Sequence, residues 1–226
     1  MDSEVDAILV AAQELKTPFV DVRQLALSFD TLDSKNELIK DEILGVSERA
    51  IRQINDLIKL RKLKDGLFEM EPVSVKPICD EVAHEMEYLF RYNNRDLFIK
   101  YSGRTSLAVA NREMLKSVVY NFLLNAMHYT GEGVRAELIV RDIGDKVRIK
   151  IRDYGPALPI DVWKEMKRGW IEKPTSIAMR PGSSGLGLFI ASKFSKYMNA
   201  NVGATRHRDG TSFFVELNKS KQASLF

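Results

Sequence analysis

The sequence predicts an α+β protein with two domains: a helical hairpin over residues 1–70, then a two-layer sandwich with helices on one side of a mainly antiparallel sheet over residues 71–226. Three observations predict this organisation. Apolar residues recur at helical spacing in two stretches, residues 8–29 and 43–58, as on one face of each of two helices. Strands that alternate apolar and charged residues appear only later in the chain. Between the two regions, MEPVSVKP (residues 70–77) carries two prolines, which is typical of an interdomain connection.

The first domain is predicted to contain two amphipathic helices. The stripe of the first helix consists of Ile8, Ala11, Leu15, Phe19, Val22, Ala26 and Phe29. After the polar stretch DTLDSKN (residues 30–36), a second stripe runs through residues 43–58 and ends at KDG (residues 64–66). A lone hairpin leaves its apolar stripe half covered, so we expect two copies to form a dimeric four-helix bundle. The alternative is a hairpin that packs onto its own downstream domain.

The second domain is predicted to alternate helices and strands. Helices are expected at residues 77–94, 111–130 and 185–199. Strands are expected at residues 96–101, 106–110, 135–142, 146–153, 200–207 and 211–218. The two long strands at 135–142 and 146–153 flank a short turn, so they should form an antiparallel hairpin with one face buried. Residues 154–184 are expected to be irregular.

Composition excludes several classes of function. The formal net charge is +3, and the basic residues are dispersed rather than clustered with aromatic residues, so we expect no nucleic-acid partner. Cys79 is the single cysteine, which excludes an internal disulfide and a cysteine-rich metal site and fits a reducing cytosol. No apolar run approaches the about 20 residues of a membrane span, and the N-terminus lacks the order of a signal peptide. We therefore expect a cytoplasmic segment that makes no membrane contact.

Polar residues gather in the helix predicted at residues 111–130. Asn121 and Asn125 are four residues apart and therefore share a face, with His128 and Tyr129 one turn further on. Amides that face a pocket need partners, although asparagines at this spacing can also serve only to cap or solvate a helix. In DYGP, Asp153 ends a predicted strand, where its carboxylate could accept a hydrogen bond from a ligand amine; read alone, this segment is a turn.

Glycines surround the start of the helix predicted at residues 185–199. Gly182, Gly185 and Gly187 lie before and within its first turn, where backbone N–H groups and the helix dipole favour phosphate. Gly155 follows Asp153 by two residues and would let a ligand approach the backbone closely. A flexible loop is the better explanation of the glycines when they are considered in isolation. The order and separation of the three segments favour a common site.

Five motifs together resemble a known family. NFLLNAMHYT, DYGP and GSSGLGLFIASKF, followed by DGTSFFVEL, are similar to the N, G1 and G2 boxes of the histidine kinase ATP-binding domain, which has the GHKL or Bergerat fold. Upstream, QELKTPF resembles the H box, His-Glu-Leu-Arg/Lys-Thr-Pro, of the dimerisation and phosphotransfer hairpin of these two-component sensor kinases. The resemblance extends from about Ile8 to Leu217.

The resemblance implies ATP and Mg²⁺ as cofactors. Asn125 would contact Mg²⁺ and the triphosphate, Asn121 would support the ion, and Asp153 would accept a bond from the adenine amino group. The remaining nucleotide-binding positions implied by the boxes are His128, Tyr129, Gly155, Gly182, Gly185, Leu186 and Gly187. Two positions depart from the family pattern: His128 replaces a common lysine, and Ala157 replaces a second glycine. Residues 156–184, including Trp163 and Trp170, would form the lid over the nucleotide, although plain core packing also explains the two indoles.

The H box lacks its phosphoacceptor. Gln13 occupies the position of the histidine, and an amide nitrogen, whose lone pair is delocalised, cannot attack phosphorus. Glu14 and Thr17 remain, and the resemblance implies that Thr17 helps dephosphorylate a response regulator. The resemblance thus implies the catalytic core of a two-component histidine kinase, with autophosphorylation disabled in this chain and a response-regulator receiver domain as partner.

Three questions stay open at this point. One alternative to the kinase core is a non-catalytic pseudokinase, an ATP-responsive dimer that binds a regulator. An anti-sigma-factor kinase fits less well, since that kind lacks the N-terminal hairpin. Gln13 is either natural or a deliberate replacement of histidine. Only about seven residues precede the first helix, so the chain is either a fragment, with an upstream sensor domain as a further partner, or a short regulator in its own right.

Overall fold

The computed structural model describes residues 2–28, 34–103, 105–160, 163–164, 166 and 185–222. These residues form two compact units, residues 1–67 and 68–226, and each is considered by itself. Among the described residues, no helix combines the length and apolar character needed to cross a membrane.

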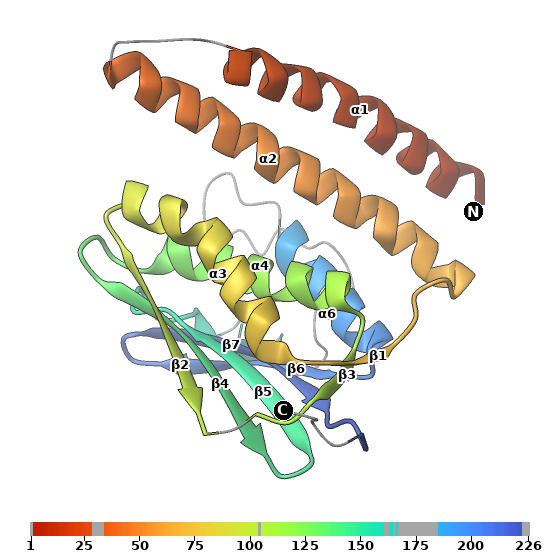
Figure 1. Ribbon diagram of the computed structural model, residues 1–226, viewed down its shortest axis with the longest axis vertical. Coiled ribbons are helices and arrows are strands. Elements are labelled where there is room, and N and C mark those ends of the chain that lie inside the picture. The colour runs from red at the N-terminus through yellow and green to blue at the C-terminus, as the bar shows by residue number, and fades with distance from the viewer. Residues whose placement is uncertain are drawn as a thin grey trace. The chain divides into compact units, whose positions relative to one another are not determined.

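The first unit is a helical hairpin (Figure 1). Helix α1 spans Asp2–Ser28 and helix α2 spans Ser34–Lys62, followed by a 3-10 turn, η1, over Leu63–Asp65. The two helices pack along their lengths, and Arg23 Nε donates to Glu48 Oε1 at 3.2 Å between them. Large apolar side chains nevertheless remain exposed on both helices, among them Leu15, Val22, Leu25, Ile39, Ile43 and Val46. The chain alone therefore leaves part of the predicted stripe uncovered.

The second unit contains a five-stranded sheet in the order β2-β4-β5-β7-β6 (Figure 1). The strands are β2 (Asp96–Ser102), β4 (Arg135–Ile143), β5 (Lys146–Arg152), β6 (Asn201–His207) and β7 (Gly210–Asn218). Only β2 and β4 pair in parallel; the other three pairings are antiparallel. The predicted hairpin at residues 135–153 is confirmed in register, with Val140 opposite Ile149.

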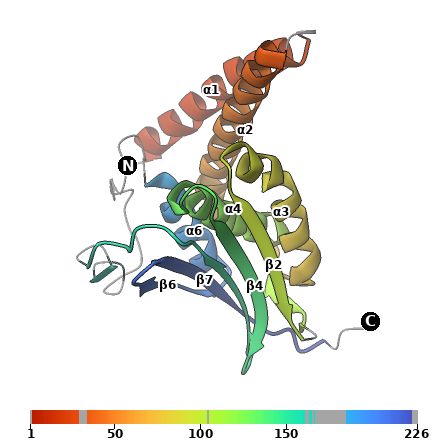
Figure 2. The same cartoon turned by 90° about the vertical axis from the view of Figure 1, so that its left-hand side faces the viewer.

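Three helices cover one face of this sheet (Figure 2). They are α3 (Val75–Tyr92), α4 (Arg112–Tyr129) and α6 (Leu186–Tyr197). The core lies between the helices and the sheet, where the rings of Phe122 on α4 and Phe213 on β7 stack with centroids 5.7 Å apart. Along β5, Val147, Ile149 and Ile151 are fully buried and alternate with charged residues, which is the pattern of a strand covered on one side. The α+β class predicted from the sequence is confirmed.

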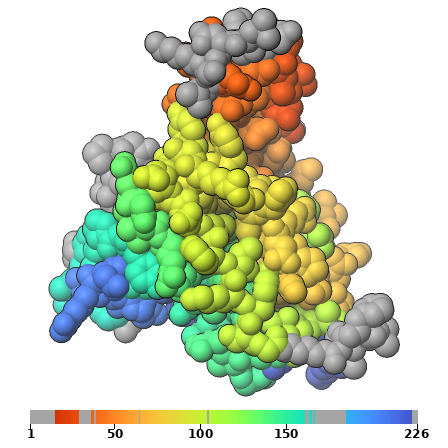
Figure 3. Space-filling model, turned by 60° about the vertical axis from the view of Figure 1, so that its left-hand side comes forward, coloured from red at the N-terminus to blue at the C-terminus, as the bar shows by residue number. Residues whose placement is uncertain are grey.

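Residues 75–102 form a continuous surface of this unit, coloured yellow to yellow-green in Figure 3. This surface combines α3 with the edge strand β2. At one end the two elements are joined by Tyr101, whose hydroxyl bonds to Asp80 Oδ1, while the ammonium of Lys76 lies 5.0 Å from the Tyr101 ring centroid.

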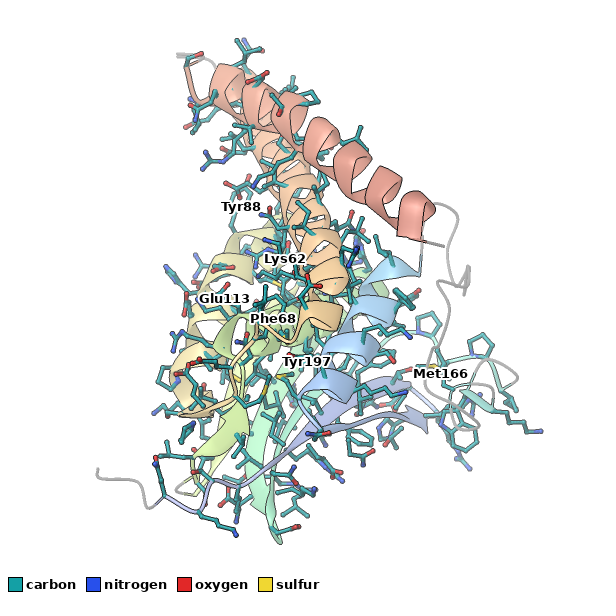
Figure 4. All side chains as sticks on the ribbon, turned by 90° about the vertical axis from the view of Figure 1, so that its right-hand side faces the viewer. Lys62, Phe68, Tyr88, Glu113, Met166 and Tyr197 are labelled. Carbon is teal, nitrogen blue, oxygen red and sulfur yellow. The ribbon has the colours of Figure 1, made fainter. Side chains whose placement is uncertain are left out.

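The predicted interdomain connection at residues 70–77 contains a short strand. Glu71–Val73 form strand β1, which pairs antiparallel with β3 (Ala108–Ala110) in a separate two-stranded sheet. The second unit also begins before residue 70. Phe68 packs edge-on against Tyr197 of α6, with centroids 6.1 Å apart, and the Tyr197 hydroxyl donates to the Phe68 carbonyl at 3.5 Å (Figure 4). These contacts attach residue 68 to the second unit.

Candidate functional site

The centre of the candidate site is the carboxylate of Asp153, directly after β5. The side chain is 1% exposed. Its Oδ1 accepts hydrogen bonds from the backbone N–H of Thr211 at 2.9 Å and of Gly155 at 3.4 Å, while its own N–H donates to the Thr211 carbonyl at 2.9 Å. The described residues give Oδ2 no hydrogen bond. One carboxylate oxygen is therefore fixed by the protein, and the other is left to accept from a ligand.

A cavity of about 210 Å³ adjoins this carboxylate. Its lining consists of Tyr129, Asp153, Pro156, Ala157, Leu158, Pro159, Thr211 and Phe213. Most of these residues are apolar or aromatic, and Asp153 supplies the charged group. An apolar slot with a single acceptor suits a flat ring that carries an amino group.

The close approach of two segments explains why residue 155 is glycine. A Cβ on Gly155 would lie 1.7 Å from the carbonyl oxygen of Tyr129, at the end of α4. No side chain can occupy that space, so glycine allows the loop after β5 to pass against the end of α4. The same contact brings Tyr129 and Asp153 to one cavity.

Burial raises the pKa of Asp153 to about 6. The N–H groups of Thr211 and Gly155 and the guanidinium of Arg152 act in the opposite direction, because each favours the ionised carboxylate. A pKa in this range keeps the carboxylate ionised at neutral pH. The group can then act as an acceptor for a ligand amine under ordinary conditions.

Asn121 meets the start of helix α6. Its side chain is 5% exposed, and its Nδ2 donates to the Ser117 carbonyl at 2.9 Å. Its Oδ1 faces Gly187, where a Cβ would lie only 2.7 Å away. Gly185, with φ of +64°, is the N-cap of α6. The two predicted motifs, the asparagine pair and the glycine segment, therefore lie against each other in the folded chain.

Asn125 is one turn further along α4 and carries an unsatisfied donor. Its Nδ2 is buried and has no hydrogen-bond partner among the described residues. A buried amide nitrogen without a partner costs free energy, about 1–3 kcal/mol for a typical polar group. A ligand oxygen at this position would satisfy it, while the amide oxygen of the same side chain is of the type that Mg²⁺ prefers.

Several predicted site residues are not brought to the cavity. His128 is half-buried and does not line it. Gly182, Trp170 and most of the predicted lid lie outside the described residues, although the N–H of Trp163 donates to the Pro159 carbonyl at 2.9 Å. Leu186 begins α6.

The H-box positions belong to the other unit. The backbone of residues 13 and 14 is part of α1, but the side chains of Gln13 and Glu14 lie outside the described set. Thr17 is exposed on α1, and Pro18 follows it inside the helix. The predicted roles of these residues stay predictions.

Sequence reasoning missed two residues that shape the site. Thr211 supplies the shortest hydrogen bond to the Asp153 carboxylate, and Arg152 is buried immediately behind it. The segment DGTSFFVEL contains Thr211, and pairing the predicted strands 146–153 and 211–218 in register would have placed it beside Asp153. No local pattern distinguishes Arg152 from the other charged residues that alternate along β5.

Comparisons with known proteins agree with this geometry. Residues 110–221 match the family described as Histidine kinase-, DNA gyrase B-, and HSP90-like ATPase. The chain is 23% identical over 216 residues to Histidine protein kinase SaeS of Staphylococcus aureus (strain USA300), which covers 92% of this chain and 62% of SaeS. The chain therefore spans less than two thirds of that relative.

Two solved structures share the fold. Full-length ShkA in complex with AMPPNP aligns with a TM-score of 0.69 at 21% identity, covering 97% of this chain and 47% of ShkA. The Acinetobacter baumannii histidine kinase AdeS aligns with a TM-score of 0.58 at 12% identity, covering 96% and 98% of the two chains. Together with the family match, these similarities support a histidine kinase-like ATPase domain that includes residues 110–221.

Proposed function

We propose that this chain is the catalytic core of a two-component histidine kinase that binds Mg²⁺-ATP in the cavity beside Asp153. The observation that carries the proposal is the half-satisfied carboxylate: Thr211 and Gly155 hold Oδ1, and the part of the chain that the structure describes supplies no donor to Oδ2. An adenine amino group would donate to that oxygen, and its ring would lie among apolar side chains of the lining.

The phosphates of the nucleotide would lie where Asn121 of α4 faces the start of α6, one turn from Asn125. The Nδ2 of Asn125, which has no hydrogen-bond partner among the described residues, would donate to a phosphate oxygen. The side-chain amide oxygen of Asn125 would contact Mg²⁺, with Asn121 in support. Mg²⁺ would neutralise charge on the phosphates. Backbone N–H groups at the start of α6, around Gly185 and Gly187, would favour the same charge because they lie at a helix N-terminus.

Calorimetric titration of the whole chain with ATP in the presence of Mg²⁺ tests this assignment. Asp153→Asn removes the acceptor for the adenine amine, and Asn125→Ala removes the phosphate and Mg²⁺ contact, so each should weaken binding at least about tenfold. Asp145→Asn makes the same change as Asp153→Asn in the exposed turn between β4 and β5 and should leave the affinity unchanged. An unchanged affinity for ATP in both Asp153→Asn and Asn125→Ala would contradict the proposal.

The partner proposed for the first unit is a second copy of this chain. Leu25 is 70% exposed, Ile39 is 48% exposed, and further apolar side chains on α1 and α2 share this exposure. Such a row of apolar groups along a hairpin is covered when two hairpins form a four-helix bundle. A response-regulator receiver domain would then bind beside the exposed Thr17 on α1.

A non-catalytic role is the second candidate, and Gln13 favours it. An amide offers no basic lone pair to accept the γ-phosphoryl group, so ATP would bind without autophosphorylation. Glu14 and Thr17 nevertheless remain in the sequence. Turnover of a phosphorylated regulator separates the candidates, because a kinase core that lacks only its phosphoacceptor should still accelerate regulator dephosphorylation through Thr17, whereas a scaffold should only bind.

A further inference from the structure

Arg152 is a buried cation directly behind the proposed adenine contact. The residue is 7% exposed at the end of β5. Its Nη1 donates to the carbonyl of Asp153 and, at 3.4 Å, to that of Thr211, and its Nη2 donates to Asp209 Oδ1 at 2.6 Å. Its guanidinium also lies 4.4 Å from the ring centroid of Tyr154. A buried cation without partners costs free energy. These contacts pair the Arg152 guanidinium and hold the side chain in one position.

The acceptor of this ion pair lies in the turn before β7. The Asp209 side chain is 69% exposed, so its carboxylate is held at the surface end of the pair. Gly210 follows with φ of +130°, and a Cβ there would lie 2.3 Å from the Asp153 carbonyl oxygen and 2.7 Å from Arg152 Nη1. The turn therefore passes in contact with the Asp153 backbone. The next residue, Thr211, donates its N–H to the Asp153 carboxylate.

We propose that Arg152 and Asp209 are positioning residues for nucleotide selectivity. Their ion pair fixes the turn and the Asp153 peptide together, and thereby aims the Asp153 carboxylate at a ligand amino group. Neither residue lines the cavity. The inference rests on the proposed nucleotide function and extends it, because it assigns preference for an amino-bearing purine to a pair outside the binding pocket.

A neighbouring ion pair provides the matched control. Arg148 lies four residues earlier on β5 and pairs with Glu216 of β7, with Arg148 Nε donating to Glu216 Oε1 at 2.7 Å. The guanidinium also packs on an aromatic ring, that of Phe214 at 4.8 Å. The Arg148 pair thus resembles the Arg152 pair in strand, chemistry and ring contact, but it does not contact Asp153.

The experiment compares ATP with inosine triphosphate, in which an oxygen replaces the amino group. Affinities of the whole chain for both nucleotides are measured by calorimetry at pH 8 with Mg²⁺, alongside the thermal unfolding temperature. Asp209→Ala and Arg152→Met should lower the affinity for ATP about tenfold and the affinity for inosine triphosphate less than about twofold. Only the contact with the amino group depends on the orientation of the Asp153 carboxylate. Arg148→Met should leave the ratio of the two affinities unchanged. Asp209→Glu keeps the carboxylate and should restore most of the ATP preference.

The outcomes separate the two proposals. If the unaltered chain binds both nucleotides equally, the adenine contact at Asp153 itself is wrong. If the unaltered chain prefers ATP and Asp209→Ala keeps that preference, the positioning role is overturned, even if the variant unfolds at a lower temperature. Should Arg152→Met fail to fold, Asp209→Ala decides alone, since its side chain lies in an exposed turn.

Discussion

Replacement of Asp153 by asparagine should stabilise the second unit at neutral pH while it weakens nucleotide binding. Asparagine retains a carbonyl oxygen that can accept the N–H groups of Thr211 and Gly155, so the internal hydrogen bonds survive. It places a donor, rather than an acceptor, toward the cavity. It also removes a buried charge, whose burial disfavours folding.

The size of the stabilisation follows from the pKa of Asp153. Folding raises this pKa from its ordinary value of 3.8 to about 6. Because the folded state binds the proton more tightly, the stabilisation from the protonated carboxyl is fully present below pH 3.8 and is lost as the pH rises through about 6. The difference of about 2.2 between these values, at about 1.36 kcal/mol for each pKa unit, corresponds to about 3 kcal/mol. Asparagine does not titrate, so the free energy of unfolding of the variant should exceed that of the unaltered chain by an amount that grows by about 2.5 kcal/mol from pH 4 to pH 8.

Urea unfolding followed by tryptophan fluorescence measures this difference. Trp163 and Trp170 both belong to the second unit, so the signal reports on that unit. Asp145→Asn, in the exposed turn between β4 and β5, makes the same chemical change away from the site. A pH-dependent gain shared by both variants, or a loss of stability in Asp153→Asn that is constant across pH, would refute the reasoning.

Three further predictions concern packing, assembly and phosphoryl transfer. Gly155→Ala should unfold or severely destabilise the second unit in urea, because its Cβ would overlap the Tyr129 carbonyl, whereas Gly131→Ala has its nearest contact at 3.6 Å and should be tolerated. Light scattering should give a dimer mass at tens of micromolar, and Leu25→Glu should shift it to the monomer; a monomer in the unaltered chain would contradict the bundle. Incubation with γ-labelled ATP should leave no acid-labile, base-stable phosphate on this chain, and Gln13→His should introduce it; label on the unaltered chain would point to another acceptor.

Local periodicity explains why most elements could be predicted from the sequence. Burial on one side of a helix or strand imposes a period on the chain, and α4 and the β4–β5 hairpin display it clearly. Strand β1 has only three residues, one of them Pro72, and owes its structure to pairing with β3. Likewise, Phe68 joins the second unit through Tyr197, which is 129 residues away in sequence. Neither feature produces a local sequence pattern from which it could be predicted.

The candidate site likewise contains residues that could be predicted from the sequence and residues that could not. Motif residues such as Asp153 and Gly187 could be singled out because their types and spacing carry the chemistry. The residues that contact these motif residues are brought to the site by the pairing of β5 with β7. Thr211 bonds to Asp153 across 58 residues of sequence, and Asp209 bonds to Arg152 across 57. Arg152 reads in the sequence as one more exposed charge on an alternating strand. In the folded chain it is buried, with Asp209 of the turn before β7 and the ring of Tyr154 against its guanidinium.

Amide side chains occupy two positions that bear on what this chain can do with bound ATP. At the nucleotide site, Asn121 donates through Nδ2 to Ser117 and presents Oδ1 toward Gly187, and an amide has too little basicity to take a proton from water. On α1, the side chain of Gln13 has no nucleophilic nitrogen that could attack phosphorus. ATP would therefore persist on this chain as a bound ligand, with little hydrolysis or transfer, and would stabilise the folded second unit in proportion to its concentration. Any chemistry left to the chain would act on a phosphorylated regulator, which is why regulator turnover, rather than ATP consumption, is the measurement that separates a disabled kinase core from a scaffold.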